Sequence, residues 1–324
     1  MSVIPKPLPW QQELWVEVTA LALQDRLGHA LLLSGPAGVG KRAFAKALTA
    51  FLLCEQRSGY ACGRCRSCEQ LAAGAHPNSI VLALEVDDKT GKQKRDISVE
   101  QVREFSERLQ LTSHYGQAKV ATIDPADALN AAGVNALLKT IEEPSGHTHV
   151  LLISERAMAL PATLRSRCQR LQFAPPAQQE AMAWLHEHHP EVGEQTLALA
   201  HGAPLRAAEL AQSGLVERYA SWEKGMSDLA AGRGDPLALA AAIAKEKDDV
   251  PAYFSWLQLW LAGLLRGAVG AAPKKLALPA PALQQMMREA IDAQRRLGGN
   301  AVPQLLLESV IVLWWRLARP VKAA

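Results

Sequence analysis

The sequence predicts an α/β fold with a parallel sheet, followed by a second half that is entirely helical. Short apolar segments alternate with helical ones over residues 29–154, and this alternation is typical of strands joined by right-handed helical crossovers. A glycine-rich loop directly after the first strand is typical of a phosphate-binding loop. After Ala174-Pro175-Pro176 only helical patterns remain.

Each element of the α/β half has its own signal in the sequence. Continuous apolar runs indicate strands buried on both faces, at residues 29–34, 80–86, 120–123 and 150–154. Helical periodicity between them covers residues 10–28, 41–53, 98–109 and 129–142. Gly28 is the expected C-terminal cap of the first helix, and Ser98 and Gln101 form a capping box for the third. Pro144 is expected to end the fourth.

The chain is expected to form three domains. Residues 1–175 form the α/β domain, which carries an inserted cysteine loop at residues 54–68. Residues 176–212 form a small helical domain and residues 213–324 a larger one. Trp256 and Trp260 lie on one helical face, where core packing is the simplest interpretation.

Composition excludes several classes of protein. Hydrophobic residues make up 49% of the 324 and charged residues 21%, which excludes a disordered chain. The net charge of +3 excludes a polybasic nucleic-acid binder. Residues 1–9 lack the apolar core of a secretory signal, and Leu305–Leu317 is too short to span a bilayer. We therefore expect a cytoplasmic protein with no membrane partner.

The glycine-rich loop is Gly35-Pro36-Ala37-Gly38-Val39-Gly40-Lys41-Arg42, which matches G-x-x-x-x-G-K. Its glycines let backbone N–H groups surround phosphate oxygens, and Lys41 is placed to reach the outer phosphates. The eighth position normally supplies a hydroxyl for Mg²⁺, but here it is Arg42, which cannot bind a cation. The loop is therefore either a nucleotide site for ATP or ADP without normal metal chemistry, or a phosphate-loop fold that has lost its ligand.

Asp124 follows the strand over residues 120–123, where the second carboxylate of a phosphate-loop ATPase would lie. Hydrolytic proteins of this class follow that aspartate with a glutamate that orients the attacking water, but here Pro125 follows. Arg42 and Pro125 thus alter two separate parts of the phosphoryl-transfer machinery. Together they predict a chain that does not turn over ATP.

Four cysteines, Cys54, Cys62, Cys65 and Cys68, have the spacing C-x₇-C-x₂-C-x₂-C. Four thiolates this close can complete one tetrahedral site, so we expect structural Zn²⁺ with no open position for substrate. Zinc would contribute on the order of 10 kcal/mol to folding of an otherwise irregular loop. An iron–sulfur cluster and free thiols are the alternatives, although the sequence lacks the Cys-Pro of a ferredoxin run.

Two further segments follow the phosphate loop in a recognisable order along the chain: the run from Asn135 to Pro144 (N-A-L-L-K-T-I-E-E-P) and the triplet Ser166-Arg167-Cys168. With the four cysteines, they resemble the delta-prime family of bacterial DNA polymerase III clamp-loader subunits, which are AAA+ proteins. The resemblance covers residues 29–176 closely. The missing glutamate after Asp124 separates the chain from the ATP-hydrolysing gamma/tau subunit.

The resemblance implies a place in DNA replication. It implies an AAA+ domain, a helical lid and a helical collar that joins a pentameric ring with gamma/tau and delta subunits. The ring loads the sliding clamp on primed DNA, and this chain would be its non-hydrolysing stator. Arg167 would be an arginine finger that reaches the γ-phosphate of ATP on a neighbouring gamma/tau subunit, and Ser154 would lie near the sensor-1 position.

By itself the chain is expected to have no activity, although it would belong to the DNA polymerase III holoenzyme, a DNA-directed DNA polymerase and hence a nucleotidyltransferase. Two alternatives come from other classes of protein. One is an active motor ATPase of the gamma/tau type, which Arg42 and Pro125 oppose. The other is a zinc-dependent DNA-binding module built on residues 54–68, which has only Tyr60 for stacking on bases.

Overall fold

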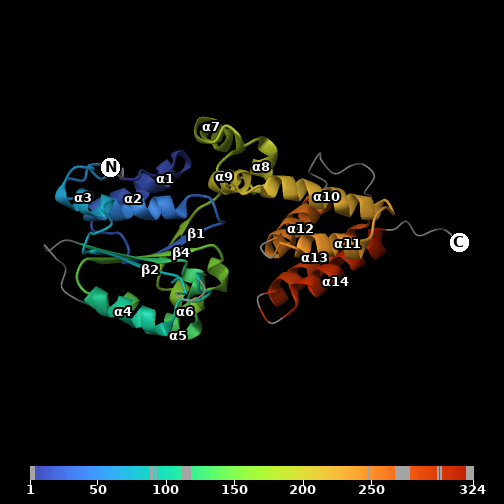
Figure 1. Ribbon diagram of the computed structural model, residues 1–324. Coiled ribbons are helices and arrows are strands. Elements are labelled where there is room, and N and C mark those ends of the chain that lie inside the picture. Colours follow the sequence, from blue (N-terminus) through green and yellow to red (C-terminus); the bar gives the residue numbers. More distant parts are fainter. Residues whose placement is uncertain are drawn as a thin grey trace. The chain divides into compact units, whose positions relative to one another are not determined.

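The computed structural model describes residues 4–87, 91, 93–110, 118–246, 249–266, 278–297, 299 and 301–318. The chain divides into two compact units, Met1–Ala208 and Glu209–Ala324. The first holds the sheet and the second only helices (Figure 1). The finer division of the first unit at residues 175 and 176 remains a prediction.

The first unit is built on five parallel strands in the order β2-β3-β4-β1-β5. Their bounds are β1 Ala30–Ser34, β2 Ser79–Ala83, β3 Lys119–Asp124, β4 Thr148–Ser154 and β5 Gln169–Gln172. The predicted α/β fold with a parallel sheet is confirmed. β5 has no counterpart among the predicted strands, because Leu171 is the only apolar residue in this short edge strand.

Helices cover both faces of the sheet (Figure 1). On one face, α1 (Gln12–Leu23) and α2 (Lys41–Leu53) pack on Leu31 and Leu33. On the other, α4 (Val99–Gln110) and α5 (Ala131–Glu142) pack with Leu32 in a separate core. Because side chains alternate along β1, this strand supplies residues to both cores. Each buried leucine contributes roughly 1.5–3 kcal/mol to the stability of the fold.

The helix ends follow local chemistry. Ser98 Oγ accepts from the N–H of Gln101 at 3.2 Å, and Gln101 Oε1 accepts from the N–H of Ser98 at 2.9 Å, so the predicted capping box at α4 is confirmed. The prediction that the first helix ends at Gly28 is wrong. α1 ends at Leu23, because Asp25 takes a left-handed φ of 54° and the N–H of Arg26 returns to the carbonyl of Leu21 at 2.9 Å.

Short elements connect the strands and complete the first unit. They are η1 (Pro9–Gln11), α3 (Arg66–Ala72), η3 (Ala126–Ala128), η4 (Ala157–Ala159) and α6 (Ala162–Arg165). Three helices follow the sheet: α7 (Gln178–His188), α8 (Glu194–Leu199) and α9 (Pro204–Gln212), the last of which begins within this unit.

The second unit contains α10 (Leu215–Ala230), α11 (Pro236–Ala244), α12 (Asp249–Arg266), α13 (Ala280–Leu297) and α14 (Pro303–Ala318). Its core is aromatic: Trp256 is buried and stacks on Trp260 with ring centroids 5.5 Å apart. Trp314 is also buried, and its indole N–H donates to the carbonyl of Met226 at 2.8 Å. The predicted core role of the tryptophans on α12 is therefore confirmed. None of the described helices is long and apolar enough to cross a bilayer.

Candidate functional site

The phosphate loop connects β1 to α2, as the sequence predicts. Gly38 and Gly40 have φ of 76° and 92°, a left-handed backbone that favours glycine. Gly40 is also the residue from which α2 starts, so the loop turns directly into the helix N-terminus. This is the backbone geometry on which a phosphate-binding loop depends.

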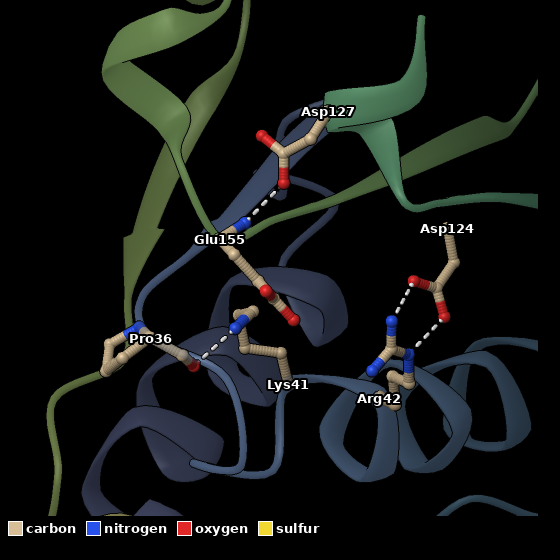
Figure 2. A network of polar contacts seen from close by, with 6 residues as sticks. All are labelled: Pro36, Lys41, Arg42, Asp124, Asp127 and Glu155. Carbon is tan, nitrogen blue, oxygen red and sulfur yellow. Dashed lines mark hydrogen bonds and ion pairs between the residues drawn. The ribbon is translucent and has the colours of Figure 1, made fainter. Parts of the chain in front are cut away.

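Lys41 is directed back onto its own loop. Its Nζ donates to the carbonyls of Gly35 at 2.7 Å and Pro36 at 2.6 Å. The residue is only 5% exposed, and burial lowers the pKa of its ammonium. Figure 2 shows the Glu155 carboxylate turned toward it. The cation that would meet outer phosphates is thus engaged by backbone carbonyls and faces a carboxylate.

Arg42 and Asp124 form a bidentate ion pair beside that lysine (Figure 2). Arg42 Nε lies 2.6 Å from one carboxylate oxygen, and Nη2 lies 2.9 Å from the other. β3 ends at Asp124, so this carboxylate stands where the sequence places it. The guanidinium occupies the acceptor atoms that a Mg²⁺ shell would use.

Asp127 is a site residue that sequence reasoning missed. Its carboxylate accepts from Ser154 Oγ at 2.7 Å and from the backbone N–H of Glu155 at 2.6 Å. It therefore ties η3 to the end of β4 and fixes the residue predicted near the sensor-1 position. The spacing D-P-A-D was the only signal, and nothing in it specifies a partner on another strand.

Two segments from elsewhere in the first unit cover the outside of the phosphate loop. The N–H of Leu205, in the first turn of α9, donates to the carbonyl of Gly38 at 3.1 Å. The indole N–H of Trp10 donates to the carbonyl of Val39 at 3.0 Å. Trp10 also meets Trp184 of α7 edge-on, with centroids 5.6 Å apart. These contacts hold α7 and α9 against the phosphate loop.

Replacing Gly38 with alanine is expected to destabilise the protein by about 2–3 kcal/mol. An added Cβ would lie 2.4 Å from the backbone nitrogen and Cβ of Arg206, at a backbone φ of 76°. Gly74→Ala is the matched control, because Gly74 has a similar φ of 68° but nothing within 4 Å of its Cβ. That variant should lose only about 1 kcal/mol. Urea unfolding measures both, and equal losses would contradict the close packing of α9 on the loop.

The four predicted cysteines converge on one point. Their Sγ atoms all lie within 4.8 Å of one another. Cys54 and Cys65 are 4.0 Å apart, as are Cys62 and Cys68. A tetrahedral site with metal–sulfur bonds of about 2.3 Å requires sulfur separations of about 3.8 Å, so the donor set fits a metal and not a pair of disulfides.

Backbone N–H groups around the cysteines stabilise thiolates, whereas burial opposes them. The N–H groups of Gln56 and Cys62 donate to Cys54 Sγ at 3.4 and 3.2 Å. The backbone N–H of Arg64 lowers the pKa of the Cys62 thiol to about 6, whereas burial raises the pKa of Cys54 and of Cys68. N–H donors to sulfur stabilise thiolate ligands in this way.

Polar contacts and ring stacking also attach the cysteine loop to its neighbouring elements. Ser67 Oγ lies 3.2 Å from Glu55 Oε1 and 3.3 Å from His76 Nε2, and His76 is buried. Tyr60 stacks on Trp15 with centroids 5.7 Å apart, and its hydroxyl lies 2.9 Å from Gln12 Oε1. The ring of Tyr60 is therefore already packed against another residue of the first unit.

Arg167 lies in the turn between α6 and β5. Its Nε donates to a carboxylate oxygen of Glu142, and its Nη1 donates to the carbonyl of Thr163 at 2.9 Å. Leu164 is fully buried, and Cys168 packs against the same core, so both neighbours anchor the turn. The side chain of Arg167 itself remains 40% exposed.

The surface beside this turn carries two further arginines. A hollow of about 330 Å³ is lined by Leu32, Ala157, Met158, Ala162, Arg165, Ser166 and Arg170. Its lining includes two arginines and no acidic residue. Nε of Arg165 is buried and has no hydrogen-bond partner within the described residues. The charges of Arg165 and Arg170 favour an anionic group here over a cationic one.

Comparison with known proteins identifies the family. The family model described as DNA polymerase III, delta subunit, matches residues 10–177. DNA polymerase III subunit delta' of Pseudomonas aeruginosa PAO1 is 38% identical over 80% of this chain and 77% of that protein. Its counterpart in Escherichia coli K12 is 36% identical over 82% of this chain and 78% of that protein. The chain belongs to the DNA polymerase III delta-prime family.

The predicted resemblance to delta-prime clamp-loader subunits, and with it a role in DNA replication, is confirmed at the level of the family. A solved structure of a gamma-subunit-related protein of DNA polymerase III from Thermotoga maritima aligns with a TM-score of 0.52 at 14% identity. The alignment covers 93% of this delta-prime family member and 99% of the other chain, and it shows that the two chains share a fold.

Proposed function

We propose that the chain is the non-hydrolysing stator of a cytoplasmic clamp loader, assembled with gamma/tau and delta subunits and acting on a sliding clamp and primed DNA. The bidentate pair between Arg42 and Asp124 carries this proposal. It occupies the carboxylate that would hold Mg²⁺, and Pro125 stands where a water-orienting glutamate would be. The chain then contributes contacts to turnover of ATP on a neighbour, and hydrolyses none itself.

The same pair argues against a motor ATPase. Phosphoryl transfer needs Mg²⁺ to bridge the outer phosphates, and a fixed guanidinium repels it. Lys41 is bound to carbonyls of its own loop, and Glu155 adds negative charge where phosphates would approach. Gly35, Gly38 and Gly40 thus keep the fold of the loop, while these contacts weaken its capacity to hold ATP or ADP.

Mg²⁺ is expected to leave the affinity of the isolated chain for ATP unchanged, because Arg42 already neutralises Asp124. Arg42→Thr restores a hydroxyl and frees the carboxylate, so in that variant Mg²⁺ should strengthen ATP binding by about tenfold, or 1.4 kcal/mol. Arg42→Ala is the control, since it frees Asp124 without adding a ligand. Calorimetric titration with and without Mg²⁺ decides this. Mg²⁺-dependent binding with phosphate release by the natural chain would overturn the stator assignment.

We assign zinc to the four cysteines, because a closed set of four sulfurs is typical of a structural zinc site. The metal would fix the loop at residues 54–68 and supply no chemistry of its own. A zinc-dependent DNA-binding module remains the weaker interpretation. Tyr60, the loop's only aromatic residue, stacks on Trp15 and lies 5.7 Å from Lys6 Nζ, which leaves it poorly placed to stack on a base.

Arg167 is proposed as the arginine finger that reaches ATP on the neighbouring gamma/tau subunit. Its turn is anchored in the core while its guanidinium is exposed, which is what action on a separate molecule requires. Arg165 and Arg170, which line the hollow beside this turn, add positive charge that favours an anionic neighbour at this edge.

A further inference from the structure

Glu142 is the ion-pair partner of Arg167, and the proposed function gives it no task. It is the last residue of α5, whereas Arg167 follows α6, 25 residues later. One carboxylate oxygen of Glu142 accepts from Nε of Arg167. The inference drawn from this pair rests on the proposed arginine finger.

The hydrogen bonds hold the guanidinium at Nε and at Nη1, and its remaining N–H groups form a free end. A guanidinium has five N–H donors. One is taken by Glu142 and a second by the carbonyl of Thr163, at 2.9 Å from Nη1. The remaining donors lie on Nη1 and Nη2, and no acceptor in the described part of the chain contacts them. Phosphate takes two parallel N–H groups of this kind.

The position of Glu142 is costly for its own helix. Aligned backbone dipoles leave partial negative charge at the C-terminus of α5, which disfavours a carboxylate there. Glu142 is 44% exposed, so it is not needed to fill a core. Its contact with Arg167 gives a reason for a carboxylate at this position that helix stability does not give.

The backbone around Arg167 is already fixed, so the side chain is the remaining source of freedom. Leu164 is fully buried and Cys168 packs on the core, one on each side of the arginine. A long side chain that is ordered before binding loses less entropy when it meets its target. We propose that Glu142 is a positioning residue, which holds the Nε edge of Arg167 so that its free end points outward to the neighbour's phosphate.

The test is phosphate release by the complete clamp loader assembled with gamma/tau, delta and this chain. The phase that is lost in Arg167→Ala defines the adjoining site. In Glu142→Ala the rate constant of that phase is expected to fall about fivefold, as loss of one half-exposed ion pair predicts. Glu142→Gln keeps an acceptor for Nε and should fall less. The affinity of the complex for ATP and its assembly should not change.

Glu143→Gln is the matched control, because it removes the same charge one residue further along the same helix end. It should leave the rate constant unchanged. Adding Glu142→Ala to Arg167→Ala should cause no further loss, since the two act as a unit. An unchanged or raised rate in Glu142→Ala would overturn the positioning role. If Arg167→Ala itself has no effect, the arginine finger fails instead, and the two failures are distinguishable.

Discussion

Arg167→Ala is expected to abolish ATP turnover at one site of a reconstituted clamp loader. An arginine supplied in trans stabilises the charge that develops on the transferred phosphoryl group, and its loss costs about 10³–10⁵ in rate at that site. The subunit itself should stay folded, because the side chain of Arg167 is 40% exposed and contributes little to the core. The measurement is phosphate release during the first turnover. The burst of phosphate should lack the share that this site contributes.

Two further variants separate the role of the guanidinium from that of its charge. Arg167→Lys keeps the charge but loses the planar fork, so it should restore little of the burst. Arg103→Ala removes an exposed arginine from α4 and should leave the burst intact. A normal burst in Arg167→Ala would refute the assignment. If both alanine variants lowered the burst equally, the cause would be the general charge of this unit.

Cys68→Ser is expected to remove the metal and unfold the loop that it holds. Cys68 is buried within the four-sulfur cluster, so a hydroxyl in its place leaves three thiolates around a weakened site. Structural zinc contributes apparent binding free energies on the order of 10 kcal/mol. Metal analysis should find one zinc per natural chain and little in the variant, and limited proteolysis should cleave the variant between residues 54 and 72.

Cys168→Ser is the matched control for the metal. Cys168 is a cysteine outside the cluster, and it packs on the core beside Arg167. The zinc content of the Cys168→Ser variant should equal that of the natural protein. Iron in the natural protein would favour the iron–sulfur alternative, and full zinc content in Cys68→Ser would contradict a four-cysteine site.

Local patterns predicted the elements whose signals are short-range. The capping box at Ser98, the buried strand before the phosphate loop and the clustering of four cysteines all depend on residues close together in the chain. The prediction failed where a distant element decided the outcome. β5 is a strand only because it pairs with β1, and its own residues alternate too weakly to show it. A second failure is local: α1 ends at Leu23, because Asp25 takes the left-handed φ that residue type alone favours at a glycine such as Gly28.

The sequence by itself determined the family, the phosphate-loop fold and the residues that depart from ATPase chemistry, because these are properties of residue identity in a fixed order. The tertiary structure decided what those residues contact. It paired Arg42 with Asp124, 82 positions apart, and Arg167 with Glu142, 25 positions apart. It also packed α9 on Gly38. Such pairings depend on how strands and helices are arranged in space, which no local pattern of charge or periodicity specifies.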